Sequence, residues 1–294
     1  MTPTPERVFI IGAGLMGGGI AQVCAQRGLQ VALCDLSQEI LGRARKTIAW
    51  SAGKLIEKGK VEGPLERVME RISLTVGRAP VAEADLVIEA VFEDLALKRD
   101  VLADLDRRAP ERALFASNTS AIPITELAAA TSRPERVLGL HFFSPVPMMQ
   151  AVEVVRGIAT SDETFAAGQE LVRRLGKEPI PVHRDVPGFL LNRLNLPSSI
   201  EAMRLVEQGV GTVEDVDRGV KLAFGRRMGI FETGDMVGLD VTLGALTAMY
   251  EETRDTRWYP PEILRRKVKA GHLGRKAGRG WYLYDDEGRR LGPA

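Results

Sequence analysis

Short apolar runs alternate with longer amphipathic segments through the first 184 residues of the chain. Several of the runs are apolar at every position, which is typical of strands buried on both faces of a sheet. The segments between them carry apolar residues at helical spacing and predict crossover helices between parallel strands. The predicted strands are RVFIIG (7–12), QVALCD (30–35), RISLTV (71–76), DLVIEA (85–90), ALFASN (113–118), RVLGLHF (136–142), AVEVVR (151–156) and PIPVHR (179–184).

The pattern changes after about residue 185, where the strand signals stop. We therefore predict an α/β domain over residues 1–184 and a smaller, all-α C-terminal domain over residues 185–294. Thr212 and Asp215 form a capping-box pattern in the second domain, and Pro197 is expected to kink or break a helix there. The predicted helices of this domain cover residues 188–209, 212–225, 239–252 and 260–271.

Composition narrows the class of protein. Apolar residues make up 45% and charged residues 27% of the chain, as in ordinary globular proteins. The 40 basic residues nearly balance the 39 acidic ones, so we expect neither a nucleic-acid partner nor a membrane partner. The chain has no long apolar run and begins without a basic and apolar leader, which favours a cytoplasmic location. Cys24 and Cys34 are expected to be buried packing residues, and three histidines predict no metal site.

A glycine-rich motif directly follows the first predicted strand. Gly12 permits a tight turn, Gly14 lets backbone approach a pyrophosphate, and Gly17 allows a helix to pack closely on the strand. Asp35 ends the next strand, where its carboxylate suits ribose hydroxyls and repels a 2′-phosphate. The motif predicts a Rossmann-type, doubly wound, mostly parallel sheet that binds NAD. The alternative is a glycine-rich turn with Asp35 capping the next helix. The predicted cofactor-binding residues of the motif are Gly12, Ala13, Gly14, Leu15, Met16 and Gly17.

Eight motifs, spread over essentially the whole chain, resemble those of the 3-hydroxyacyl-CoA dehydrogenase family in its single-function, 3-hydroxybutyryl-CoA form. Their order and spacing also match, which one motif alone could not establish. The motifs are GAGLMG (12–17), VIEAVFED (87–94), SNTSA (117–121), HFFSPVP (141–147), VEVV (152–155), PGFLLNR (187–193), VGLD (237–240) and GRKAGRGW (274–281).

The resemblance gives His141 and Glu153 a catalytic role. Oxidation of a secondary alcohol by hydride transfer needs a base for the hydroxyl proton, and a neutral imidazole suits that task. A carboxylate beside it can fix one tautomer and stabilise the imidazolium. Taken alone, a histidine in a Phe-rich segment is more often a core residue. The resemblance instead implies that His141 is the base and Glu153 its partner.

Two further residues are assigned to the substrate by the resemblance. Ser120 corresponds to a serine that hydrogen-bonds the substrate oxygen near the nicotinamide, although it also has the pattern of a helix N-cap. Asn192 corresponds to an asparagine that helps to polarise the substrate carbonyl. The alternative for Asn192 is an ordinary amide at a helix end.

The resemblance also implies cofactor contacts outside the glycine motif. Glu93 and Lys98 match positions near the nicotinamide, with a solvated pair at a helix start as the alternative. Ala90 is expected to contribute backbone, and Lys276 matches a lysine close to the cofactor. Ser144 occupies a cofactor-binding position where the family usually has asparagine. Because serine is shorter, the amide contact there is lost or bridged by water.

A helical arm is expected over residues 37–70, where the chain is longer than one crossover helix needs. The resemblance places this arm beside coenzyme A and aligns Ser51 and Lys58 with its contacts. Lys54, Lys58 and Lys60 form a basic cluster suited to phosphate. A solvated helix face is the alternative.

Together these features predict an NAD-dependent L-3-hydroxyacyl-CoA dehydrogenase with an acyl-CoA substrate. The resemblance further implies a homodimer formed through the C-terminal helical domain. Two alternatives remain: a related dehydrogenase of a CoA-free hydroxy acid, such as carnitine or a sugar acid, and a non-catalytic NAD-binding structural protein.

Overall fold

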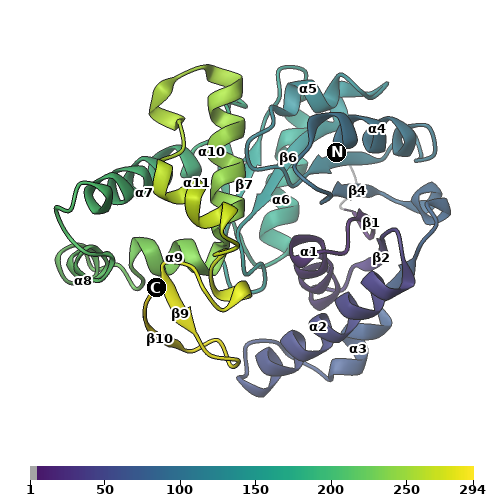
Figure 1. Ribbon diagram of the computed structural model, residues 1–294. Helices are drawn as coiled ribbons and strands as arrows, with labels where there is room; N and C mark the ends of the chain where they lie inside the picture. Colours follow the sequence, from purple (N-terminus) through teal and green to yellow (C-terminus); the bar gives the residue numbers. More distant parts are fainter. Residues whose placement is uncertain (1–4) are drawn as a thin grey trace. The chain divides into compact units, whose positions relative to one another are not determined.

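The computed structural model describes residues 5–294, which form two units (Figure 1). The first unit extends through Val186, and the second runs from Pro187 to Ala294. The sequence analysis placed this division after residue 184. The first unit carries the large sheet, whereas the second is mainly helical.

The first unit is built on one eight-stranded sheet with the order β3-β2-β1-β4-β5-β6-β7-β8. The order of its first six strands is that of dinucleotide-binding doubly wound sheets, so the predicted Rossmann-type fold is confirmed. The step from β6 to β7 is antiparallel, and the other steps are parallel. The strands are β1 (Arg7–Ile11), β2 (Gln30–Cys34), β3 (Ile72–Thr75), β4 (Leu86–Glu89), β5 (Leu114–Ser117), β6 (Val137–Phe142), β7 (Ala151–Val155) and β8 (Glu178–Val182).

Helices cover both faces of this sheet (Figure 1). A continuous apolar cluster joins one face to α1, α2, α3 and α6, whereas α4 contacts β4 and α5 contacts β6. Side chains of the central strands are therefore buried on both faces, which explains their unbroken apolar pattern. The helices are α1 (Leu15–Gln26), α2 (Gln38–Glu57), α3 (Leu65–Glu70), α4 (Leu95–Asp106), α5 (Ile124–Ala128) and α6 (Asp162–Arg174), with 3-10 turns η1 (Ala79–Glu83) and η2 (Pro134–Arg136).

Central strands β4, β5 and β6 carry polar residues at or near their carboxyl ends. Glu89, Ser117 and His141 are 0%, 1% and 6% exposed, although the strands that carry them are otherwise apolar. Side chains alternate between faces along a strand, so all three lie opposite the large apolar cluster. Ligands of open α/β sheets bind beyond the carboxyl ends of the strands, and this edge is therefore the candidate site.

The second unit is helical as predicted, but it is not purely α-helical. It ends in a two-stranded antiparallel hairpin, and it also contains helix α9. Neither element was predicted from the sequence. The capping box of Thr212 and Asp215 is confirmed. Pro197 was predicted to kink or break a helix. It lies inside α7 without ending it, so the helix is not broken there. The elements are α7 (Leu191–Glu207), α8 (Val213–Phe224), α9 (Ile230–Val237), α10 (Leu239–Thr253), η3 (Thr256–Trp258), α11 (Glu262–Lys269), η4 (Arg275–Ala277), β9 (Tyr282–Tyr284) and β10 (Arg290–Pro293).

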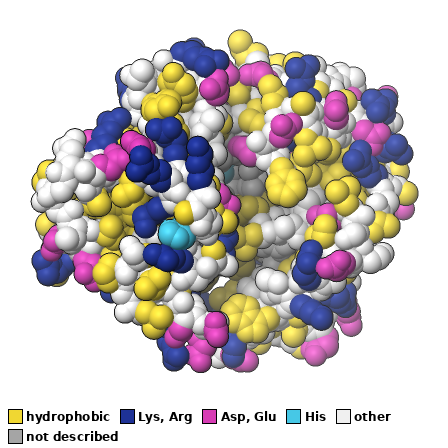
Figure 2. Space-filling view, viewed as in Figure 1, with side chains coloured by type: hydrophobic (Ala, Val, Ile, Leu, Met, Phe, Trp, Pro, Cys, Tyr) yellow, Lys and Arg dark blue, Asp and Glu magenta, His cyan; other side chains and the backbone are white. Residues whose placement is uncertain are grey.

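The distribution of charged side chains on the surface is consistent with the net charge of +1. Figure 2 shows acidic and basic side chains interspersed over most of the visible face, with a denser basic group over α11. Within residues 5–294, no helix combines the length and apolar character needed to cross a membrane. Cys24 and Cys34 are buried and free, as predicted, and burial raises the pKa of the Cys24 thiol to about 12.

Candidate active site

The glycine loop between β1 and α1 has space where a cofactor needs it. Gly12 has a φ of +100°, and a Cβ there would lie 2.4 Å from the Ala90 carbonyl oxygen. A Cβ on Gly17 would lie 1.7 Å from the Gly12 oxygen, whereas no atom of the described chain lies within 4 Å of one on Gly14. The loop is therefore packed tightly against neighbouring backbone at Gly12 and Gly17, and it is open at Gly14.

Helix α1 begins at this open side of the loop. Among the described residues, no side chain caps its first turn, which also contains no acidic residue. Unpaired N–H groups at a helix N-terminus attract phosphate oxygens. The loop thus fits a pyrophosphate. The main chain of Ala90 packs against the loop, and its N–H donates a hydrogen bond to the Ile11 carbonyl oxygen at 2.8 Å.

Asp35 lies beside the same loop, directly after β2. Its Oδ2 accepts a hydrogen bond from the Ala13 N–H at 2.6 Å, and its Oδ1 accepts one from the Leu36 N–H at 2.6 Å. The carboxylate is thus placed next to the glycine motif, where the ribose role predicted for it would require it.

His141 and Glu153 are brought together by the antiparallel step in the sheet. They occupy directly opposed positions of β6 and β7. His141 Nδ1 lies 2.6 Å from Glu153 Oε2, and the carboxylate is completely buried. The imidazole ring also packs on Phe143, with 4.5 Å between ring centroids. This arrangement holds Nδ1 against the carboxylate, which leaves Nε2 as the nitrogen suited to accept a proton.

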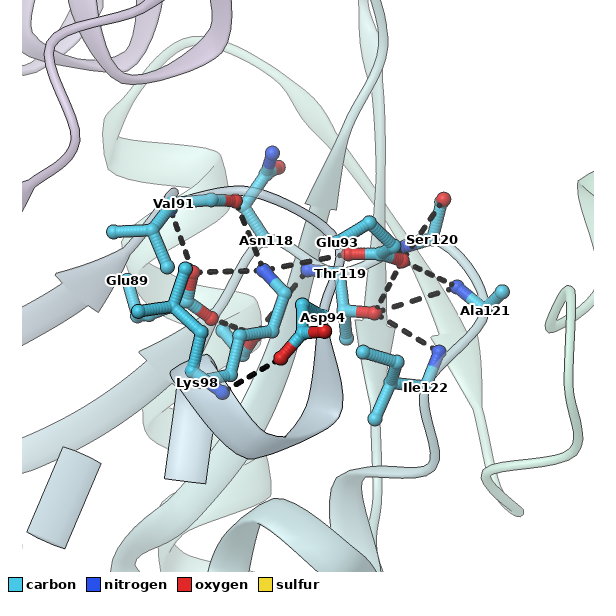
Figure 3. A network of polar contacts seen from close by, with 12 residues as sticks. Glu89, Val91, Glu93, Asp94, Lys98, Asn118, Thr119, Ser120, Ala121 and Ile122 are labelled. Atoms are coloured by element: carbon cyan, nitrogen blue, oxygen red, sulfur yellow. Dashed lines mark hydrogen bonds and ion pairs between the residues drawn. The ribbon is translucent and has the colours of Figure 1, made fainter. Parts of the chain in front are cut away.

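In the strand order, β5 lies between β1, which leads into the cofactor loop, and β6, which carries His141. The loop that follows β5 is held by Glu93 (Figure 3). Glu93 Oε1 accepts hydrogen bonds from Thr119 Oγ1 at 2.7 Å, from the N–H groups of Ser120 and Ala121 at 2.8 and 3.0 Å, and from Ser120 Oγ at 3.2 Å. These bonds and the Lys98 ammonium lower the pKa of Glu93 against the opposing effect of burial. Glu93 is therefore ionised near neutral pH and fixes the position of Ser120.

Asn118 joins this loop to β6, the strand that carries His141. Its Oδ1 accepts a hydrogen bond at 2.9 Å from the N–H of Phe142, the residue that follows His141. The sequence analysis did not single out Asn118. Its signal was a polar side chain directly after an apolar strand, one residue before the Thr119–Ser120 pair.

Lys98 is not part of the solvated pair that the sequence allowed as an alternative. It is 1% exposed, and its ammonium contacts Glu89 at 2.7 Å as well as Glu93 at 3.3 Å. The sequence analysis also missed Glu89, which is completely buried. A single carboxylate ending the apolar strand β4 was the signal that could have identified it.

The segment after His141 is fixed from two sides. A Cβ on Gly19 of α1 would lie 2.8 Å from Val146 Cβ, which explains a glycine that had no assigned role. The buried Lys177 donates hydrogen bonds from Nζ to the carbonyl oxygens of Val146 and Met149 at 2.7 and 2.5 Å. Ser144 lies half-buried in this segment. Helix α1, which begins at the cofactor loop, thus also supports the loop beside His141.

The remaining predicted residues belong to other elements and have no described contact with this cluster. Ser51 is in α2, and Lys58 follows the last residue of that helix, seven positions later and therefore on a similar face. Asn192 is in the first turn of α7 in the second unit. Lys276 lies in η4 and forms an ion pair with Asp240 at 2.7 Å. Their predicted roles remain predictions. The described residues contain no group of three His, Cys, Asp or Glu side chains arranged to hold a metal.

Comparison with known proteins identifies the class. Residues 7–186 match the family model of the 3-hydroxyacyl-CoA dehydrogenase NAD binding domain, and residues 188–284 match that of the C-terminal domain. This chain therefore belongs to the 3-hydroxyacyl-CoA dehydrogenase family, and its first unit is an NAD-binding domain.

Individual relatives resemble this chain over nearly the whole length of both proteins. A probable 3-hydroxybutyryl-CoA dehydrogenase of Deinococcus radiodurans is 44% identical over 94% of this chain and 99% of its own. The crystal structure of FadB2 from Mycobacterium tuberculosis has a TM-score of 0.92 and 40% identity, and covers 96% of this chain and 100% of its own. That of (S)-3-hydroxybutyryl-CoA dehydrogenase from Ralstonia eutropha has a TM-score of 0.88 and 41% identity, with the same coverage of both chains.

Proposed function

We propose that this protein interconverts an (S)-3-hydroxyacyl-CoA, with 3-hydroxybutyryl-CoA as the leading candidate, and the corresponding 3-oxoacyl-CoA. The observation that carries the proposal is the His141–Glu153 pair, held at 2.6 Å beside the Ser120 loop at the carboxyl edge of an NAD-binding sheet. The relatives named above, two of them 3-hydroxybutyryl-CoA dehydrogenases by name, support the choice of substrate.

The side chains divide the chemistry between them. Bound NAD supplies the acceptor for the hydride that leaves C3 of the alcohol. His141 takes the hydroxyl proton at Nε2, and Glu153 stabilises the imidazolium through Nδ1–H. Ser120 Oγ binds the substrate oxygen, and Asn192 is assigned to the substrate carbonyl. In the reverse direction the imidazolium returns the proton to the alkoxide oxygen as the alcohol forms.

An assay of NADH oxidation tests this function directly. With purified protein we expect turnover on acetoacetyl-CoA, and the rate is compared with those on longer 3-oxoacyl-CoAs. We expect weaker turnover with NADPH, because the Asp35 carboxylate proposed to bind the ribose hydroxyls would repel a 2′-phosphate. Turnover on CoA-free 3-oxo acids or dehydrocarnitine, without turnover on the CoA thioesters, would instead support the alternative dehydrogenase. Cofactor binding without turnover on any of them would indicate a non-catalytic protein.

Coenzyme A is proposed to lie along α2. Ser51 and Lys58 are separated by two helical turns, and the half-exposed Lys54 lies between them. Trp50 is 68% exposed on this helix, whereas Trp258 and Trp281 are 2% exposed. Trp50 is therefore a fluorescent probe at the proposed site.

The Lys58→Ala substitution is expected to raise the KM for acyl-CoA about 10-fold with little change in kcat, because it removes one charge-assisted phosphate contact. Coenzyme A should quench Trp50 emission in the wild type and in Arg45→Ala, a control whose side chain lies on another face of α2. An unchanged KM in Lys58→Ala would contradict the assignment of the arm.

A homodimer through the second unit is also part of the proposal. Leu222 and Phe224 on α8 are 81% and 74% exposed, which leaves apolar side chains uncovered. The two side chains are two positions apart near the end of α8 and point to different sides of the helix, so an interface that surrounds this end of α8 would bury both.

We expect a dimer in sedimentation experiments at micromolar concentration and dissociation in the Leu222→Glu/Phe224→Glu variant. Ile158→Glu is the matched control, because Ile158 is 87% exposed in the first unit. A wild-type monomer at this concentration would refute the dimer. We also propose a cytoplasmic location, with which two free and buried thiols agree.

A further inference from the structure

Two opposite charges are buried behind the Ser120 loop, where they touch neither His141 nor Glu153 in any described contact. Glu89 ends β4 and is 0% exposed, and Lys98 lies in α4 and is 1% exposed. Their side chains meet at 2.7 Å (Figure 3). Charged groups at this depth are rare unless paired, and a buried pair is often no more stable than apolar residues of the same size. Stability alone is thus a weak reason for a pair in this position.

The ammonium of Lys98 has three oxygen partners. It donates hydrogen bonds to Glu89 Oε1 at 2.7 Å and to the Val91 carbonyl oxygen at 3.2 Å, and it forms an ion pair with Glu93 Oε2 at 3.3 Å. The side chain therefore connects the end of β4 with the loop that contains Glu93. Its position is set by three oxygen partners rather than by one.

Glu89 fixes the other end of this connection. Its Oε1 also accepts a hydrogen bond from the Val91 N–H at 2.7 Å, and its Oε2 accepts one from Ser117 Oγ at 2.5 Å. Ser117 and Glu89 are paired in the register of β4 and β5. Glu89 thus joins the ends of two neighbouring strands to the lysine of α4.

Glu93 carries the connection to Ser120. Its Oε2 faces Lys98, while its Oε1 accepts hydrogen bonds from the N–H and the hydroxyl of Ser120. The path from Glu89 through Lys98 and Glu93 to Ser120 consists of direct contacts of 3.3 Å or less. A displacement of Lys98 would therefore displace the serine hydroxyl.

We propose that Glu89 and Lys98 are positioning residues for the oxidoreductase reaction, which hold Glu93 and through it set the place of the Ser120 hydroxyl. The proposal rests on the proposed function, because it assumes that Ser120 binds the substrate oxygen. Neither side chain touches the substrate in this scheme, and both act on Ser120 through Glu93. The cofactor contact predicted for Lys98 is a separate prediction.

A double variant separates positioning from stability. Lys98→Met alone leaves the buried Glu89 carboxylate without its ammonium, and Glu89→Gln alone leaves the buried Lys98 with Glu93 as its remaining carboxylate partner. We therefore expect each single substitution to lower Tm. The Glu89→Gln/Lys98→Met variant removes both charges and is expected to regain most of that Tm. Its kcat should stay about 10-fold to 100-fold below wild type, the loss expected for a group misplaced by about 1 Å. The primary isotope effect with substrate deuterated at C3 should rise, because hydride transfer becomes slower.

The pathway is tested by repeating the double substitution in Ser120→Ala. If the pair acts through the Ser120 hydroxyl, the double substitution should lower kcat little further in the Ser120→Ala background, because the effects of substitutions at linked residues do not add. An equal loss in both backgrounds, or a kcat that recovers together with Tm, would overturn the proposal. If the double variant does not fold, Ser117→Ala removes one contact to Glu89 and is judged by the same non-additivity.

The control is Asp106→Asn, which weakens the buried pair of Asp106 with Arg133 at 2.6 Å elsewhere in the first unit. It should lower Tm and leave kcat unchanged. A parallel loss of kcat in this control would mean that any destabilised first unit loses activity, which contradicts a specific positioning role. A wild-type chain without turnover contradicts the proposed function and the inference with it. An active wild type with additive losses contradicts the inference alone.

Discussion

Replacement of His141 by alanine is expected to lower kcat by about 10²- to 10⁴-fold, the usual contribution of a positioned general base. The side chain supplies the only imidazole in the cluster described above, and Nε2 is the atom assigned to the hydroxyl proton. NAD affinity should stay nearly intact, because the glycine loop and Asp35 lie on other strands. Turnover by NADH oxidation and NAD binding by calorimetry measure the two effects separately.

Stability must be controlled in this experiment. His141→Ala also removes the 2.6 Å hydrogen bond to the fully buried Glu153 carboxylate, and loss of a buried partner is destabilising. His141→Gln is the matched variant, since its amide N–H can still donate to Glu153 while offering no comparable base. We expect both variants to show this loss of kcat and His141→Gln to have the higher Tm. Near-normal turnover in either would show that the assigned base is wrong.

The second large effect is expected at the glycine loop, where two alanine substitutions should have opposite consequences. Gly17→Ala places a Cβ 1.7 Å from the Gly12 carbonyl oxygen, so the backbone must move. We expect a loss of about 3 kcal/mol in the free energy of unfolding, at the upper end for overpacking. Denaturant titration of the apo protein measures it.

Gly14→Ala is the matched substitution at the open side of the loop. Gly14 has a φ of −69°, which alanine adopts freely, so stability should change by about 1 kcal/mol or less. The added methyl group would instead occupy the space proposed for the pyrophosphate. We expect the Kd for NAD to rise about 10-fold or more, as for loss of one charge-assisted hydrogen bond. Unchanged NAD affinity in Gly14→Ala would place the pyrophosphate elsewhere.

Much of the first unit could be predicted because its signals are local. Most of the eight strands are short, mainly apolar runs, and the glycine motif specifies its own turn. The hairpin β9–β10 was missed because Tyr282–Tyr284 is a three-residue strand without a periodic pattern. Pro197 was predicted to disturb α7, yet the helix continues through it, since tertiary packing can outweigh a local preference.

The site was predictable as a set of residues but not as a set of contacts. The resemblance pointed to His141, Glu153, Ser120 and Glu93, yet the register that opposes His141 and Glu153 depends on a reversal of strand direction that composition does not specify. Glu89 and Asn118 were missed for a related reason. Their importance lies in partners that are distant in sequence, Ser117 and Phe142 respectively.

The antiparallel step between β6 and β7 also affects the order of folding. His141 and Glu153 are 12 residues apart, whereas the paired residues of β1 and β4 are more than 70 positions apart, so closing the first loop costs ~1.7 kcal/mol less chain entropy. Contacts at short sequence separation form quickly. We therefore expect His141 and Glu153 to meet early, on a hairpin that forms before β1 pairs with β4. The proposed proton-transfer pair would then be assembled before the central step of the sheet is complete.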